Sequence, residues 1–305
     1  MSESSAYDAG NEGKRDFGSI YNQPQPAPYF EALRKLDYAI PGEAKPLFQQ
    51  VIDARREAQR SDDVTMLDLG CSYGINAALL KYDLAMDQLY DWYDEREAAT
   101  TRGAVDLDRR FFAERDRQDG LAVVGIDPAE RAIEYAVEAG LLDAGISANL
   151  EDDPLPAQDL EKVRGVDLIT ATGSIGYVTE RTFRKLLPAV DAGRAPWIAT
   201  FVLRMFPYDE IIQTLGEHGF TTEKLPGVHF PQRRFADAEE AAHVRARLEE
   251  IDIDPAPEMS EHGYVAEFYL SRPSDAARQR PLADLLRAYE PAPRASSPLT
   301  RGAED

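Results

Sequence analysis

The residues best suited to chemistry follow a short apolar run. Asp68 lies within that run, at 64–69, and a glycine-rich loop, Gly70–Gly74, comes directly after it. Glycine adopts positive φ and lets a ligand approach the backbone closely. Apolar residues from Ile75 onward predict a helix, whose first N–H groups are unpaired and attract a carboxylate or a phosphate. The order of strand, glycine turn and helix therefore predicts a nucleotide-binding loop.

Two common nucleotide loops do not match this one. The dinucleotide fingerprint G-x-G-x-x-G would place its three glycines at Gly70, Ser72 and Ile75, so two of the three positions fail. The phosphate loop of nucleoside triphosphatases needs Gly-Lys-Ser or Gly-Lys-Thr, which does not occur here. A dehydrogenase and a P-loop enzyme are therefore disfavoured.

The loop instead resembles the D/E-x-G-x-G-x-G motif of class I S-adenosylmethionine-dependent methyltransferases. LDLGCSYG is similar to the family's LDLGCGTG, with Ser72 and Tyr73 as departures. VVGIDPAERAIEYA resembles the second motif, in which an acidic residue ends a strand, and GVDLITATGSIGYV resembles the fourth-strand motif. The resemblance covers about residues 60–225 and the final strand near 264–270.

This resemblance implies a Rossmann-like α/β fold, with a mostly parallel seven-stranded sheet, helices on both faces and helical insertions that form a cap. It also implies the cofactor S-adenosylmethionine (SAM), the product S-adenosylhomocysteine (SAH) and no metal. It assigns the following cofactor contacts: Asp68, Gly70, Cys71, Ser72, Gly74, Asp127, Pro128, Glu151, Asp152, Thr172 and Gly173.

Within that site, the resemblance implies that Asp68 contacts the methionine end of the cofactor. Asp127 would accept hydrogen bonds from the two ribose hydroxyls, a bidentate contact that suits a carboxylate. Asp127 could also cap the helix that begins at Pro128, and both roles can hold. Glu151 and Asp152 lie where the family often has an acid beside adenine, and a solvated acidic loop is the alternative interpretation.

No residue pattern identifies the methyl acceptor. Thr172–Ile175 follows the fourth predicted strand, at the edge where open α/β sheets bind ligands. The stretch lacks an NPPY-type tetrapeptide, which in terms of the resemblance disfavours N-methylation of DNA bases and of glutamine. Methyl transfer from a sulfonium is an in-line displacement, so the protein mainly aligns the two reactants. We expect a small-molecule acceptor, with O-methylation of a carboxylic acid or a hydroxyl as the favoured reaction.

Candidate acceptor contacts lie at strand ends and in the N-terminal arm: Tyr21, Tyr29, Tyr177, Arg204, His229 and Arg233. Arginine suits a carboxylate because its fork binds both oxygens, although a surface ion pair would also explain either arginine. His229 is the candidate general base. Two alternatives stay open. One is an N- or C-methyltransferase, and the other is a non-catalytic protein of the same fold whose cofactor pocket is filled, for example by Tyr73.

The predicted elements alternate between strands and helices, which favours a parallel sheet covered on both faces. The predicted strands are 64–69, 121–126, 146–150, 166–171, 197–203 and 263–270. The predicted helices are 30–36, a helix that starts near Pro46, 128–142, 180–190 and 209–217.

The chain divides into four predicted regions. Residues 1–20 form a disordered tail, and 21–60 form an arm and helices that act as a lid or cap. Residues 61–272 form the SAM-binding domain, and 273–305 a flexible tail with one short amphipathic turn. Two insertions interrupt the domain, namely 83–119 and the mostly helical 231–257. The first has apolar residues at helical spacing, which indicates packing on the domain, with a lid role or a homodimer contact as alternatives.

Charge and composition exclude several classes of partner. The formal net charge of −21 repels nucleic acids and anionic membrane surfaces, so we expect neither as a partner. One cysteine and four histidines without a ligand-like spacing disfavour a metal site. The acidic start of the chain does not resemble a signal peptide, and no apolar run is long enough for a membrane span, so we expect a cytoplasmic protein.

Overall fold

A computed structural model describes residue 11 and residues 18–95, 101–190, 193–287 and 289. The predictions for 1–10, 12–17 and 290–305 lie outside the described residues. The strands are β1 (Val64–Leu69), β2 (Leu121–Asp127), β3 (Ala144–Ser147), β4 (Leu168–Thr172), β5 (Trp197–Leu203), β6 (Phe220–Lys224), β7 (Phe230–Arg234) and β8 (Gly263–Pro273). The longer helices are α3 (Ala27–Arg34), α4 (Ile40–Gln59), α6 (Met86–Glu95), α7 (Thr101–Ala113), α8 (Glu130–Glu138), α10 (Glu180–Val190), α11 (Asp209–Glu217) and α12 (Ala238–Glu250). The shorter ones are α2 (Gly18–Tyr21), α5 (Ile75–Lys81), η1 (Ala157–Asp159), α9 (Leu160–Val163), α13 (Ala256–Glu261), α14 (Ser274–Gln279) and α15 (Leu282–Leu285).

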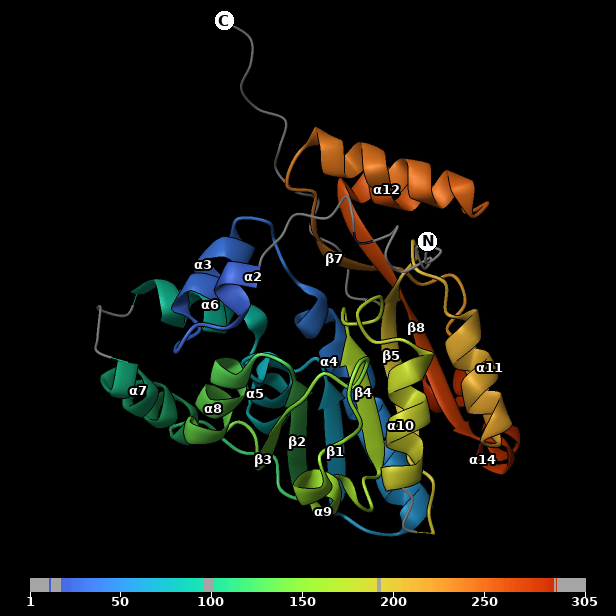
Figure 1. The fold of residues 1–305 in the computed structure, drawn as a ribbon, viewed down its shortest axis with the longest axis horizontal. Coiled ribbons are helices and arrows are strands. Elements are labelled where there is room, and N and C mark those ends of the chain that lie inside the picture. Colours follow the sequence, from blue (N-terminus) through green and yellow to red (C-terminus); the bar gives the residue numbers. More distant parts are fainter. Residues whose placement is uncertain (1–10, 12–17, 96–100, 191–192, 288, 290–305) are drawn as a thin grey trace, which may run out of the picture.

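One mixed sheet organises the described residues. Its seven-stranded path runs β3-β2-β1-β4-β5-β8-β6, and β7 pairs with β8 beside this path. The first five strands are parallel, whereas β8 is antiparallel to β5, β6 and β7. Helices lie on both sides, with α10 in front of the sheet and α4 behind it in Figure 1. The Rossmann-like fold and its mostly parallel seven-stranded sheet are therefore confirmed.

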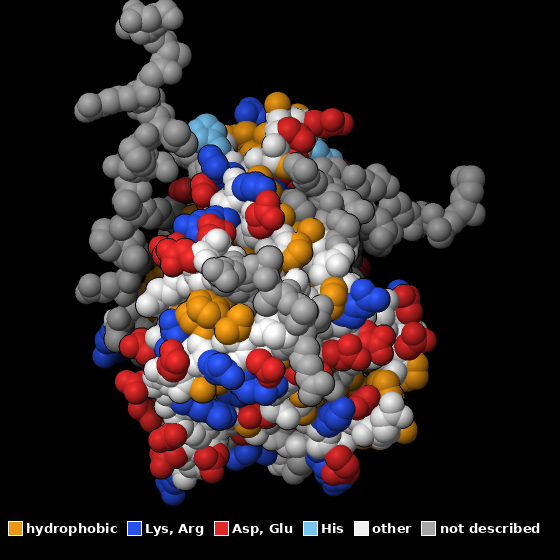
Figure 2. All heavy atoms as spheres, turned by 90° about the vertical axis from the view of Figure 1, so that its left-hand side faces the viewer, with side chains coloured by type: hydrophobic (Ala, Val, Ile, Leu, Met, Phe, Trp, Pro, Cys, Tyr) orange, Lys and Arg blue, Asp and Glu red, His pale blue; other side chains and the backbone are white. Residues whose placement is uncertain are grey.

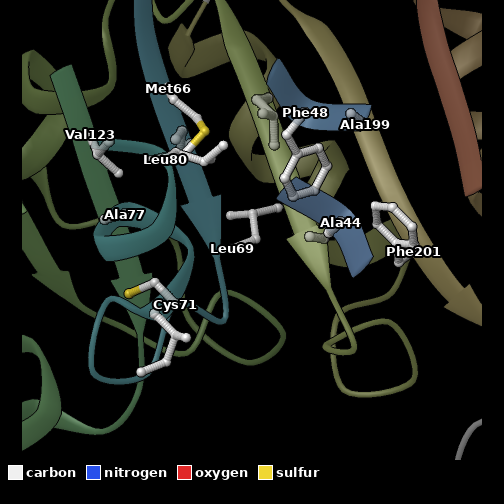
Figure 3. Close-up of a cluster of buried hydrophobic side chains, with 14 of the residues drawn as sticks. Ala44, Phe48, Met66, Leu69, Cys71, Ala77, Leu80, Val123, Ala199 and Phe201 are labelled. Carbon is white, nitrogen blue, oxygen red and sulfur yellow. The ribbon is translucent and has the colours of Figure 1, made fainter. Parts of the chain in front are cut away.

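The central strands are buried on both faces, as their mostly apolar sequences predict. Every residue of β4 and of β5 is buried. In Figure 3, Met66 of β1 lies beside Leu80 of α5, and Phe48 of α4 lies near Phe201 of β5. The two phenyl rings meet edge to face at 5.4 Å. Complete burial of each such side chain contributes about 1.5–3 kcal/mol to the free energy of unfolding.

The strand order reverses between β1 and β4, and this reversal leaves a crevice at one edge of the sheet. β1 pairs with β2 on one side and with β4 on the other. The loops that leave β1 and β4 therefore diverge toward opposite sides of the sheet and leave a crevice at the carboxyl ends of the strands.

Helix starts differ from the predictions in three places. α3 begins at Ala27 rather than at Phe30. α4 begins at Ile40, with Pro41 in its first turn, so Pro46 lies inside the helix rather than at its start. α8 begins at Glu130 rather than at Pro128. Proline fits any position in the first turn because the N–H groups there have no intrahelical partner, so the residue type alone does not fix the start.

The first insertion packs on the N-terminal helices. The apolar residues of α6, namely Met86, Leu89, Tyr90 and Tyr93, are buried, as their spacing predicts. Tyr93 stacks on Phe30 of α3 with ring centroids 4.1 Å apart. On the face that includes these elements, acidic and basic side chains are interspersed (Figure 2), and Arg34 pairs with Asp91 and Asp94.

The second insertion and the chain ends contain more regular structure than expected. β7 was not predicted, and it precedes the expected acidic helix, α12, which lies above the strand ends in Figure 1. Part of the predicted N-terminal tail is helical, in α2. Within the predicted C-terminal tail, α14 and α15 pack on the domain, and Leu282 and Leu285 are buried. None of the described helices has the length and apolar character that a membrane span requires.

Candidate functional site

A cavity of about 1170 Å³ lies at the reversal of strand order. Its walls come from the loops after β1, β2, β3 and β4, from the N-terminal segment around α2 and α3, and from β7. This volume exceeds the range of about 300–1,000 Å³ that suits one small ligand, so the cavity can hold two molecules side by side.

The loop after β1 forms the floor of the cavity. Gly70 has φ +71°, and a Cβ there would lie 2.5 Å from the Cβ of Ser174 in the loop after β4. Ser72 has φ +48°, a left-handed conformation that costs a non-glycine residue about 1–2 kcal/mol. Gly74 turns the chain into α5 with φ +76°. Ser72 stands where the methyltransferase motif that this loop resembles has glycine, and its left-handed conformation adds strain to the loop.

Cys71 has a packing role. Its side chain is buried at the start of the loop, as Figure 3 shows. A Cβ on Gly125 of β2 would lie only 2.5 Å from the Cys71 sulfur, so glycine is required opposite it. Burial raises the pKa of the Cys71 thiol well above its usual value. The thiol therefore stays protonated. Cys71 belongs to the cavity lining because it is part of the loop after β1.

Asp127 links the loops after β1 and β2. Its Oδ2 accepts a hydrogen bond from the Ser72 amide at 2.9 Å, and its Oδ1 accepts one from the Ala129 amide at 2.9 Å. Burial raises the pKa of Asp127, and the two backbone hydrogen bonds oppose that change. Asp127 and the exposed Pro128 both line the cavity. The side chain therefore supports the turn that precedes α8 and at the same time presents a carboxylate to the cavity.

Asp68 lies beneath the cavity wall, and Asn76 separates it from the space. The fully buried Asp68 carboxylate accepts hydrogen bonds from Asn76 Nδ2 at 3.1 and 3.2 Å and from Thr170 Oγ1 at 2.8 Å. Asn76 Nδ2 also donates to Thr172 Oγ1 at 3.1 Å. Burial raises the pKa of Asp68 to about 6. Asn76 lines the cavity, and its buried Oδ1 has no hydrogen-bond partner among the described residues.

The acids after β3 behave differently from one another. Glu151 lines the cavity, but its carboxylate accepts hydrogen bonds from the Thr179 amide (2.8 Å), from Thr179 Oγ1 (2.6 Å) and from Thr182 Oγ1. It therefore fastens this loop to the start of α10. Asp152 is exposed, bonds to Asn149 and does not line the cavity. The neighbouring residues 148–150 form the wall instead.

The loop after β4 forms the opposite wall. Thr172, Gly173 and Ser174 all line the cavity, as expected. Ser174 Oγ donates to the Leu69 carbonyl at 2.8 Å, which joins this loop to the end of β1. Gly173 has φ +73°, and a Cβ there would lie 3.1 Å from Nε2 of Gln232 on β7. The positive φ favours glycine at this position, and a side chain there would press against Gln232 of β7.

The candidate acceptor contacts separate into two groups. Tyr21, Tyr29, Tyr177 and Arg233 line the cavity, together with Tyr38 and Gln232, which the sequence analysis did not select. Arg204 and His229 are not among the lining residues. Arg204 Nη1 pairs instead with Glu258 Oε2 at 2.6 Å, and His229 Nε2 lies 3.7 Å from Glu267 Oε1.

Arg233 reaches the cavity as a member of a buried ion pair. Its two Nη atoms bond to the two carboxylate oxygens of Glu240 at 2.9 and 2.6 Å, and both side chains are buried. Desolvation lowers the pKa of Arg233, but the contacts with Glu240 outweigh it and the net shift is upward. The guanidinium also lies 4.6 Å above the Tyr264 ring. Glu240 therefore neutralises the charge that would hold an acceptor carboxylate.

Tyr73 points away from the cavity. It is fully buried and is not a lining residue. Its hydroxyl accepts a hydrogen bond from the Gln23 amide at 2.8 Å and can donate to the carbonyl of Ile20 (2.9 Å) or of Gln23 (3.1 Å). Its ring meets those of Tyr29 and Tyr135 edge to face. Tyr73 therefore fixes the N-terminal segment above the loop and does not fill the pocket.

Tyr73→Phe is expected to loosen the N-terminal segment without unfolding the domain. The phenylalanine keeps the ring contacts but leaves the Gln23 amide without its acceptor, a loss of about 1 kcal/mol. Hydrogen exchange of the Gln23 amide should accelerate about fivefold, while exchange in β1 and β4 stays unchanged. Tyr82→Phe, which removes a long 3.5 Å contact elsewhere, is the control. Equal exchange at Gln23 in Tyr73→Phe and in the unaltered protein would contradict this account of the hydroxyl.

No family model matches this sequence, and no curated protein matches it. Solved structures of three methyltransferases are similar to the chain. A plantazolicin methyltransferase in complex with SAH is 11% identical, with 88% of this chain and 97% of that chain covered and a TM-score of 0.45. The SAM-bound magnesium protoporphyrin IX methyltransferase of Synechocystis PCC 6803 is 12% identical, with 88% of this chain and 92% of that chain covered and a TM-score of 0.39. A TehB-like SAM-dependent methyltransferase of Corynebacterium glutamicum is 13% identical, with 72% of this chain and 85% of that chain covered and a TM-score of 0.36.

Proposed function

We propose that this chain is a SAM-dependent methyltransferase that acts on a small molecule. One observation carries the proposal. Ser72 Oγ and Asn76 Oδ1 are buried without partners among the described residues, and both belong to the cavity wall that contains the Asp127 carboxylate. A buried acceptor without a partner costs about 1–3 kcal/mol, which a ligand rich in hydrogen-bond donors would recover. An adenosine linked to an amino acid carries donors of this kind.

Each part of the cofactor has a suitable counterpart in the cavity wall. Asp127 would accept hydrogen bonds from the ribose hydroxyls, since its contacts with Ser72 and Ala129 leave lone pairs on both oxygens. Asn76 Oδ1 would accept a hydrogen bond from the ammonium group, with the Asp68 charge directly behind it. The wall at 148–150 would lie against adenine.

When bound, SAM supplies an electrophilic methyl group: the sulfur–methyl bond breaks as the acceptor–methyl bond forms, sulfur keeps the electron pair, and a hydroxyl acceptor releases its proton to water. The protein's contribution is alignment and partial exclusion of water. Gly70 allows the loop after β4 to approach the loop after β1 closely, and Gly173 allows Gln232 of β7 to approach the loop after β4. The N-terminal segment, held by Tyr73, covers the same space.

Among acceptors, we favour O-methylation of a hydroxyl over that of a carboxylic acid. A carboxylate needs a desolvated, available cation. Arg233 is already paired with Glu240 inside the wall, and Arg181, the other arginine of the lining, is exposed to solvent. Arg204, paired with Glu258, does not line the cavity. The net charge of −21 also favours small neutral or cationic acceptors over nucleic acid.

A non-catalytic protein of the same fold is the alternative. That interpretation needs a filled cofactor pocket, and the orientation of Tyr73 toward the N-terminal segment argues against it.

Calorimetric titration with SAH tests the proposed function, with NADH as the control ligand. Binding of SAH alone supports the proposal. Binding of NADH alone, or of neither ligand at about 1 mM, would exclude it, since substrates bind enzymes mostly between about 1 µM and 1 mM.

A further inference from the structure

One part of the cavity has aromatic walls. Tyr21, Tyr29, Tyr38 and Tyr177 all line it. Tyr29 meets Tyr21 edge to face at 5.5 Å and Tyr38 at 6.3 Å, so three of the rings form one continuous group. We call these four residues the tyrosine wall. Aromatic walls of this kind favour flat, ring-bearing ligands, because ring pairs gain about 0.5–1.5 kcal/mol beyond the area that they bury.

Gln232 supplies a polar group at the same wall. The residue is 7% exposed, and its Oε1 has no hydrogen-bond partner among the described residues. A Cβ on Gly173 would lie 3.2 Å from this oxygen, which places the amide against the loop after β4. The backbone carbonyl oxygen of Gln232 accepts a hydrogen bond from the Ala39 amide at 2.8 Å, which holds the backbone of this residue in place. The side-chain oxygen, Oε1, is suited to a ligand that donates a hydrogen bond.

Acidic side chains outnumber basic ones in the lining of the cavity around Gln232. Arg233, the next residue, is paired with the buried Glu240 through two hydrogen bonds. Burial raises the pKa of the Tyr21 and Tyr38 phenols above their usual range, so both stay neutral at physiological pH. The remaining charged residues of the lining are four acids, Asp127, Glu151, Glu180 and Glu210, and one exposed arginine, Arg181. An anionic ligand would find an acceptor oxygen at Gln232 and acids around it.

We propose that Gln232 and the tyrosine wall form the acceptor subsite, and that this subsite takes a neutral, ring-bearing molecule whose hydroxyl donates a hydrogen bond to Gln232 Oε1. This inference rests on the proposed function, because it assumes that the cofactor occupies the other part of the cavity. It makes Gln232 a determinant of specificity, since its side-chain oxygen can accept a hydrogen bond from a hydroxyl, which neither an ether nor a carboxylate can donate.

Three simple probes test the subsite in the SAH complex: phenol, anisole and benzoate. Anisole has the same ring without the donor, and benzoate adds the negative charge. Probe binding is followed by the 1H–15N signal of the Gln232 side-chain amide, which is identified by its loss in Gln232→Leu. We expect phenol to bind about fivefold to tenfold more tightly than anisole, the equivalent of one hydrogen bond, and benzoate to bind more weakly than both.

In Gln232→Leu, phenol should lose its advantage over anisole, while affinity for SAH stays within about twofold because no cofactor contact is removed. Gln213→Leu, on the exposed face of α11, is the matched control and should keep the advantage. Tighter binding of benzoate, an unperturbed Gln232 signal with all three probes, or a phenol advantage that survives in Gln232→Leu would each overturn the proposal. If SAH itself fails to bind, the proposed function fails. If SAH binds and phenol does not, only the acceptor subsite fails.

Discussion

Asp127→Ala should weaken the binding of SAH by at least about 100-fold. A hydrogen bond to a charged group contributes about 1.5–3 kcal/mol, and Asp127 would make two of them with the ribose hydroxyls. The substitution also leaves the amides of Ser72 and Ala129 without their acceptor, so the cavity floor loses its link to β2. Calorimetric titration of the variant with SAH measures the loss.

Asp152→Ala is the control for this experiment. Asp152 was predicted to contact the cofactor together with Glu151, but it is exposed and lies outside the cavity wall. We therefore expect its removal to change SAH affinity by less than about twofold, as for most surface substitutions. Equal losses in the Asp127 and Asp152 variants would argue for a general effect of negative charge and against a ribose contact.

Asp68→Asn should have opposite effects on stability and on binding. The folded state raises the pKa of Asp68 from 3.8 to about 6 through burial, so the folded protein holds this proton more tightly than the unfolded chain. This group's contribution to stability therefore falls as the pH rises from about 4 to about 6, and is constant above that. Near pH 7.5 the buried charge costs about 3 kcal/mol, which asparagine removes.

Chemical denaturation at several pH values measures this effect. The ligand-free variant should be more stable than the unaltered protein near pH 7.5, and the difference should vanish toward about pH 4, where both side chains are neutral. Affinity for SAH should move the other way: it is weaker in Asp68→Asn, and in the unaltered protein it declines below about pH 6 as Asp68 takes up its proton. If Asp68→Asn is less stable than the unaltered protein at every pH, the Asp68 carboxylate does not carry an unfavourable buried charge, and this account is wrong.

The sequence was informative wherever local pattern and chemistry coincide. Three predicted segments contribute to the cavity wall: the glycine loop after 64–69, the end of the run at Asp127 and the stretch after β4. The positions of these segments in the sequence are sufficient to predict that they meet, because parallel strands bring their carboxyl ends to one edge of the sheet.

The remaining features depend on contacts between distant segments. Asn76 could be placed in a helix from the sequence, but its role depends on Asp68 and Thr172, which flank it in space. Gln232 lies on a strand within a segment that was predicted to be mostly helical, and the residues next to it in the sequence do not indicate that it faces Gly173. The neutralisation of Arg233 by Glu240 is likewise visible only after α12 has packed on β7. Tertiary packing decides such positions, and residue type alone does not.

The most direct test of the central claim is a calorimetric comparison of SAH with 5′-methylthioadenosine, which lacks the amino-acid end. We expect SAH to bind at one site per chain with a dissociation constant below about 1 mM. We also expect Asn76→Ala to weaken SAH about tenfold while it leaves methylthioadenosine unchanged, because only SAH carries the ammonium group that Asn76 would contact. An absence of SAH binding, or an equal loss for the two ligands, would contradict the account of this cavity as a SAM site.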